Sequence, residues 1–181
     1  MNRGRMLAFL GVAGPLIAYL SIAVSIALTP EFSWLSNALS DLGHAKRSSV
    51  AVIFNGGLLL SGFTLVVYAV KPLALHAKRT AVALAFSALM LQAVAAFDEV
   101  YGFAHFVVSV LFFASSGAAC LVYSLERRSL PAAVAFAVGL LAWILYWAGA
   151  YKVGIAVPET ISAVAVTSIV VYSALRIMKG G

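Results

Sequence analysis

Apolar residues are gathered into six long runs that short polar segments separate. The runs cover residues 6–28, 50–70, 80–97, 103–125, 131–150 and 158–178. Each run is roughly 18–23 residues long, and a helix of that length crosses a hydrocarbon core about 30 Å thick. Inside lipid a span must satisfy its own backbone hydrogen bonds, which excludes an open sheet. The pattern predicts an all-α polytopic membrane protein in which residues 1–181 form a single six-helix transmembrane domain.

The composition agrees with this prediction. Hydrophobic residues make up 64% of the chain and charged residues 10%, whereas soluble domains are about 25% charged. The lone cysteine, Cys120, excludes a disulfide framework within the chain and a metal site built from several cysteines. A net charge of +6 would suggest a nucleic-acid partner in a soluble protein, but here the basic residues lie between apolar runs and report on topology. The expected partner is therefore the lipid bilayer and not nucleic acid, and the oligomeric state stays open.

Charge placement predicts the orientation in a cell membrane. Nine of the twelve lysines and arginines fall on one side of six alternating spans: Arg3, Arg5, Lys71, Lys78, Arg79, Arg127, Arg128, Arg176 and Lys179. Because cytoplasmic loops carry an excess of basic residues, both termini are expected in the cytoplasm. Five of the six acidic residues fall on the opposite, outer side. Acidic residues have little influence on topology, so their asymmetry indicates a polar feature at the outer face.

The longest loop, residues 29–49, has an amphipathic pattern. Thr29, Pro30 and Glu31 are typical of a helix start, and Gly43 is placed to end the helix. Trp34 and Leu35 would lie on an apolar face, with Asn37 and Asp41 one turn apart on the polar face. We therefore expect a short amphipathic helix over residues 30–43 in the outer interface, serving either as an anchor or as a lid over an outer cavity.

Polar residues converge in the outer third of the membrane. The candidate binding residues of an outer pocket are Asn37, Ser40, Asp41, Asn55, Asp98, His105 and Glu159. Ionisable groups near a bilayer are costly and mark functional sites, although helix capping by Asp98 or Glu159 and interhelical bonding by Asn55 are structural alternatives. We expect Asn37, Asp41, Asn55 and Glu159 to come together, with the polar side of the loop helix turned inward.

Most catalytic and cofactor motifs are missing. The chain has no G-x-S-x-G elbow, and Ser115 and Ser116 lie at the other end of a span from His105. No cofactor is predicted. A zinc ion held by His105 with Asp41 or Glu159 is an alternative, since zinc accepts carboxylate ligands, but no metal-ligand spacing supports it.

Several segments resemble a known family. The most specific is the run Ser36-Asn37-Ala38-Leu39-Ser40-Asp41-Leu42-Gly43; the others are Phe54-Asn55-Gly56-Gly57 with Gly62, Phe97-Asp98-Glu99 with His105, the pair Phe112-Phe113, and Pro158-Glu159. Together they resemble the uncharacterised prokaryotic membrane family called domain of unknown function 998. The resemblance covers most of the chain and implies a six-helix fold, with no assigned activity or catalytic residue.

Three functions remain open. The first is an outward-facing polar pocket that binds a small ligand, a cation or a lipid headgroup, for binding or transport. The second is a membrane-embedded hydrolase acting on lipid through a site of histidine and carboxylates. The third is a structural or assembly subunit whose polar outer rim only seals helix ends.

The orientation leads to a labelling prediction. A cysteine placed at Ser48 should react with a membrane-impermeant reagent added to intact cells, and one at Ser129 or Gly180 should not. Labelling of the latter two positions, with Ser48 protected, would invert the topology.

Overall fold

The computed structural model describes residues 3–180, and regular structure within that range is helical throughout. The elements in chain order are α1 (Arg3–Ala8), α2 (Leu10–Ala27), η1 (Ser40–Gly43), α3 (Ala51–Tyr68), η2 (Ala69–Leu73), α4 (Ala74–His76), α5 (Lys78–Ala96), η3 (Glu99–Tyr101), α6 (Phe103–Glu126), α7 (Leu130–Trp147) and α8 (Ala156–Lys179). Six helical segments in this range are long and apolar enough to cross a membrane. The chain is thus an all-α, multi-pass membrane protein, as its apolar runs predict.

The spans differ from the predicted ones chiefly at their ends. The first begins with α1, which breaks at Phe9 before α2, and the fifth ends at Trp147, three residues earlier than expected. The second span continues through a π-helical turn, η2, that contains Pro72. Proline has no N–H to donate and disturbs the regular hydrogen-bond ladder, so a local change of helical pitch is expected there.

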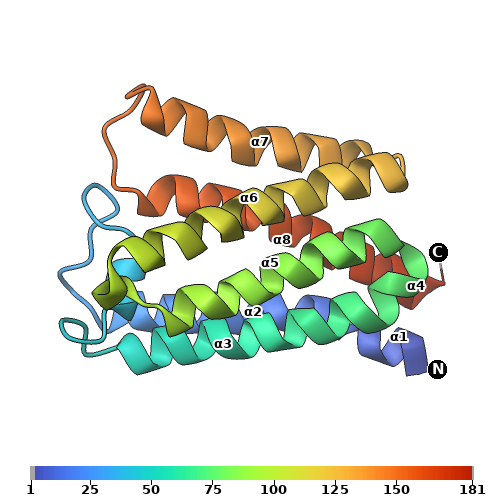
Figure 1. Cartoon of the computed structure of the whole chain (residues 1–181), viewed down its shortest axis with the longest axis horizontal. Helices are drawn as coiled ribbons and strands as arrows, with labels where there is room; N and C mark the ends of the chain where they lie inside the picture. Colours follow the sequence, from blue (N-terminus) through green and yellow to red (C-terminus); the bar gives the residue numbers. More distant parts are fainter. Residues whose placement is uncertain (1–2, 181) are drawn as a thin grey trace.

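The spans alternate in direction, so both ends of the chain lie at one end of the bundle (Figure 1). We call this the terminal end. The opposite end, which carries residues 28–50, 97–102 and 148–155, is the long-loop end. Helices α2, α3, α5, α6 and α8 surround a shared interior, and α7 packs on the outside against α6 and α8.

Small residues let α2 approach α3 closely. A Cβ added at Gly11 would meet the ring of Tyr68, and one added at Gly14 would meet the side chain of Leu65. Between the same two helices, the Ser61 hydroxyl donates to the Gly14 carbonyl at 2.8 Å. Close backbone approach and interhelical hydrogen bonds are what hold helices together in lipid, where water exclusion contributes little.

The prediction of an amphipathic helix over residues 30–43 is wrong. Only a four-residue 3₁₀ turn, η1, forms there, and the remainder is turns and extended chain. Side chains replace the helical ladder: Asn37 Oδ1 accepts from the Ser33 N–H at 2.9 Å, and Asp41 Oδ2 accepts from the Ala38 N–H at 2.9 Å. Asn and Asp compete with helix in this way wherever their short side chains reach nearby backbone groups. Gly43 does end η1, as expected.

Two glycines of α3 provide a matched test of the packing against α5. A Cβ at Gly62 would lie 2.6 Å from Gln92 Cγ and 2.8 Å from the Ala88 carbonyl oxygen, whereas a Cβ at Gly56 would meet nothing within 4 Å. We expect Gly62→Ala to lower the free energy of unfolding by about 1–3 kcal/mol, because a backbone atom must move. Gly56→Ala should be neutral or stabilising, since alanine favours helix. Unfolding by SDS titration in mixed micelles measures both; equal stability of the two variants would contradict the packing described.

Candidate functional site

The loop at the long-loop end docks into the bundle through residues 33–43, which we call the plug segment. Three elements bind it. Glu159 of α8 accepts a hydrogen bond from the Leu39 N–H through Oε2 at 2.8 Å, and Asn55 of α3 donates to the Gly43 carbonyl at 2.7 Å. Glu99 of η3 accepts from the Ser40 hydroxyl at 2.7 Å. The plug segment is therefore held by polar bonds from three separate places in the chain.

Backbone groups ahead of α8 complete the docking. The Gly154 N–H donates to the Trp34 carbonyl at 2.9 Å, and the Ala156 N–H donates to the Asn37 carbonyl at 3.0 Å. Gly154 has to be small, because a Cβ there would collide with the backbone of Asn37. These bonds occupy the carbonyls that a helix over this segment would have used, which is a second reason why none forms.

The plug segment has a rigid polar interior of its own. Asn37 Nδ2 donates to Asp41 Oδ2 at 2.7 Å, and the same oxygen accepts from the Ala38 N–H. The four residues expected to meet are thus linked through one short stretch: Asn37 and Asp41 lie within it, and Asn55 and Glu159 bind its backbone. Trp34 and Leu35 point away, with 42% and 72% of their surface exposed, as expected for contact with lipid.

Three carboxylates interact electrostatically at this end of the bundle. Asp41, Glu99 and Glu159 come from the plug segment, η3 and α8, and within residues 3–180 no lysine, arginine or histidine forms an ion pair with any of them. Burial raises the pKa of the Glu99 carboxyl above its ordinary value. The hydrogen bond from Ser40 opposes this shift, and the negative charge of Asp41 adds to it. The cluster therefore carries excess negative charge, which His105 of α6 offsets in part through its electrostatic interaction with Glu99.

Asp98 and His105 have local roles. Asp98 is 9% exposed and accepts a hydrogen bond from the Val100 N–H at 2.8 Å. It therefore caps the 3₁₀ turn η3 and not the helix of the fourth span, α6. His105 Nδ1 lies 2.8 Å from the Phe97 carbonyl, and its Nε2 lies 3.3 Å from the hydroxyl of Ser109, one turn further along α6. Among the described residues no three or more histidine, cysteine or acidic side chains are arranged to hold a metal ion. The geometry therefore gives no support to the zinc alternative at His105, Asp41 and Glu159.

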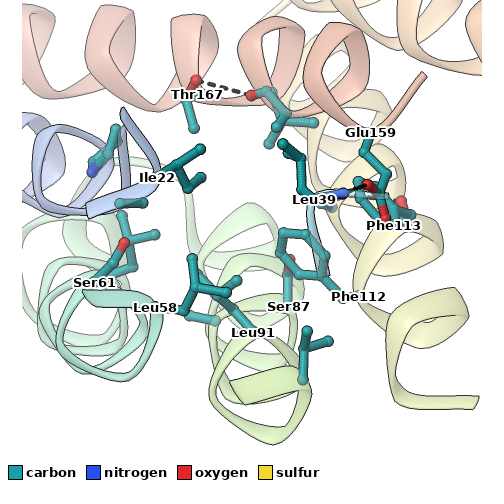
Figure 2. Close-up of a pocket in the computed structure, with 18 of the residues that line it drawn as sticks. Ile22, Leu39, Leu58, Ser61, Ser87, Leu91, Phe112, Phe113, Glu159 and Thr167 are labelled. Atoms are coloured by element: carbon teal, nitrogen blue, oxygen red, sulfur yellow. Dashed lines mark hydrogen bonds between the residues drawn. The ribbon is translucent and has the colours of Figure 1, made fainter. Parts of the chain in front are cut away.

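An interior cavity of about 110 Å³ lies beneath the plug segment (Figure 2). Leu39 and Ser40 border it at the long-loop end. Its walls are mainly apolar and come from five helices; they include Ile22, Leu58, Leu91, Phe112, Val166 and Val170. Hydroxyl groups are spaced around the walls, and two of them, on Tyr19 and Thr167, bond each other at 2.6 Å. The cavity is thus largely apolar, and the loop borders it at one end.

A larger cleft of about 470 Å³ lies between α6 and α7, with α8 as its floor. Phe106 and Trp147, on its two walls, are 56% and 69% exposed on the outside of the bundle. The cleft is therefore open to the outside of the bundle between α6 and α7.

Aromatic rings run along the cleft from α6 to α7. Phe113 contacts Trp143 edge to face with ring centroids 5.0 Å apart, and Trp143, Tyr146 and Trp147 continue the series. The Trp143 indole N–H donates to the Ser162 hydroxyl of α8 at 3.2 Å, which fixes the ring against the cleft floor. Nothing in the sequence spacing of Trp143 shows that it faces another helix, so sequence reasoning does not identify it as part of a cleft.

Glu159 is the residue common to all of these features. It lies in the first turn of α8, where the helix dipole favours negative charge, and it borders both the interior cavity and the cleft. Its Oε2 is held by Leu39, whereas no group within residues 3–180 hydrogen-bonds its Oε1. A carboxylate with a spare acceptor therefore faces apolar space on two sides.

Comparison with known proteins shows the family. The family described as Protein of unknown function (DUF998) matches residues 12–176, so the chain belongs to it. No curated protein and no solved structure matches the chain.

Removing the Glu159 carboxylate should release the plug segment. In Glu159→Ala the Leu39 N–H loses an acceptor that carries charge, a bond worth about 1.5–3 kcal/mol. We expect hydrogen–deuterium exchange of the peptide containing Leu39 to become about ten- to a hundredfold faster.

The matched control is Glu31→Ala, which removes an exposed acid from the same loop. Unchanged exchange in Glu159→Ala, or equal acceleration in both variants, would show that Glu159 does not anchor the segment.

Proposed function

We propose that this member of the DUF998 family binds an amphiphile with a cationic head group. The head group lies against Glu159, and the apolar tail lies in the cleft between α6 and α7. One observation carries the proposal: the carboxylate of Glu159, with one oxygen unbonded within residues 3–180, stands where an apolar, laterally open cleft ends.

The charge of the site favours a cation. A carboxylate turned toward apolar surroundings costs several kcal/mol unless a partner offsets its lost hydration. Asp41 and Glu99 add negative charge nearby, and among the described residues His105 acts electrostatically on Glu99 while no basic group does so on Glu159. A ligand that brings positive charge to Glu159 therefore supplies a countercharge that the described residues do not.

The aromatic wall narrows the choice of head group. Trp143 and Phe113 border the same cleft as Glu159. Aromatic ring faces attract cations, and combinations of such rings with an acid are how proteins recognise quaternary ammonium groups. We infer that a substituted ammonium fits this place better than a small hydrated metal ion.

The shape of the cleft favours an apolar tail. Its volume of about 470 Å³ lies within the range of about 300–1,000 Å³ typical of small-molecule sites. Phe106, Val110 and Leu140 line it and are also exposed on the outside of the bundle. A tail already dissolved in the bilayer can therefore enter the cleft from the side. With the orientation expected from the basic residues, the head group would lie in the outer leaflet.

A second candidate is hydrolysis of a lipid ester. The pair formed by Ser109 and His105 favours it, since Phe97 accepts from Nδ1 and leaves Nε2 free to take the serine proton. Binding is better supported, because Ser109 lies inside α6, where the neighbouring backbone N–H groups are used in the helical ladder and cannot stabilise an oxyanion. That stabilisation is usually the largest catalytic contribution.

Alkyl surfactants with matched tails test the proposal. Dodecyltrimethylammonium should bind the protein in a nonionic maltoside micelle with one-to-one stoichiometry by native mass spectrometry, and dodecyl sulfate should not. Glu159→Gln keeps the side-chain shape but removes the charge, and we expect it to weaken binding about ten- to a hundredfold.

Glu31→Gln removes an exposed acidic charge and serves as the control, with binding unchanged. Equal binding by Glu159→Gln and the unaltered protein, or equal binding of the cationic and anionic surfactants, would refute the proposal.

A further inference from the structure

Phe113 stands between the two cavities. Four residues border both of them: Ser109, Phe113, Glu159 and Val166. Of these, only Phe113 has a large planar side chain. Figure 2 shows it next to Glu159 and Leu39, at the side of the interior cavity that adjoins α6. The interior cavity and the cleft are thus neighbouring compartments, separated at Phe113 and both reaching Glu159.

The ring of Phe113 is held by aromatic contacts. Phe112 packs on one side with centroids 4.9 Å apart, and Trp143 on the other with centroids 5.0 Å apart. Such contacts contribute about 0.5–1.5 kcal/mol each and impose no covalent or hydrogen-bonded constraint. The partition is therefore a side chain that a substitution can remove without breaking a polar network.

The interior cavity suits hydrocarbon better than water. A buried water needs two to four polar partners, and a cavity lined by Leu, Ile and Phe stays dry. The wall hydroxyls of Ser116 and Thr167 already donate to carbonyls of their own helices. An apolar tail that reached this space would gain contacts without displacing tightly bound water.

We propose that Phe113 determines how long a tail the protein accepts, by closing the interior cavity to a ligand whose head lies at Glu159. This inference rests on the proposed binding of a cationic amphiphile and adds a specificity for the length of its tail. With Phe113 in place the tail occupies the cleft and, beyond it, the surrounding lipid; without it the tail reaches about 110 Å³ of further apolar space. Each methylene moved from water into apolar surroundings is worth roughly fourfold in affinity, so the difference should be visible in a tail-length series of ions that enter from water.

The experiment compares alkyltrimethylammonium ions from octyl to hexadecyl, measured by native mass spectrometry in a nonionic maltoside micelle. In the unaltered protein we expect affinity to rise with tail length and then level off. In Phe113→Ala the plateau should move at least two carbons longer, with the longest tails bound about tenfold more tightly than by the unaltered protein.

A control variant removes the same side-chain volume on the far side of the partition. Phe112→Ala enlarges the interior cavity but leaves Phe113 in place, since Phe112 borders only that compartment. It should keep the plateau of the unaltered protein. Phe113→Leu replaces Phe113→Ala if the latter does not fold, and a shift in the same direction is expected.

The outcomes separate this inference from the function on which it rests. If the unaltered protein binds none of the ions, the proposed function is refuted and the inference with it. If it binds them but Phe113→Ala keeps the same plateau, or Phe112→Ala moves it equally, only the role of Phe113 is refuted.

Discussion

The hydrogen bond from the Leu39 N–H to the Glu159 carboxylate is the interaction on which the long-loop end depends. It joins residues 120 positions apart and sets the plug segment over the interior cavity. Because a buried charge needs a hydrogen-bond partner, it also determines which oxygen of Glu159 is used and which is left facing the cavities. Loop docking and the candidate site are therefore two consequences of one carboxylate.

The opposite end of the bundle shows what a purely structural carboxylate looks like. Glu126 accepts the Arg79 N–H at 3.0 Å through Oε1, and the N–H and hydroxyl of Thr80 at 2.9 and 2.8 Å through Oε2. Both oxygens are thus bonded to the first turn of α5, as in a helix cap supplied by a neighbouring helix. Glu159 differs in having one oxygen bonded and the other without a hydrogen bond from residues 3–180, in a side chain that borders two largely apolar cavities. This difference supports a ligand at Glu159 and none at Glu126.

The sequence predicts the spans well because length and hydropathy alone determine them. It also places four polar residues at one end of the bundle, because polar residues must avoid lipid: Asn37, Asp41, Asn55 and Glu159. It fails for the loop helix, since the groups that displace it include Gly154 and Ala156, which no local pattern connects to residues 34–37. The cleft could not be predicted from the sequence for a similar reason. Phe113 and Trp143 look like ordinary apolar or interfacial residues until the packing of α7 on α6 and α8 brings their rings together.

The most direct test of the proposed binding site is an experimental structure of the protein with an alkyltrimethylammonium ion whose tail ends in bromine. Anomalous scattering then locates the tail end independently of any interpretation of the density. We expect the bromine to lie inside the cleft between α6 and α7 and the ammonium to lie against the free oxygen of Glu159. Bromine found only among the lipids around the bundle, with the cleft empty, would contradict it.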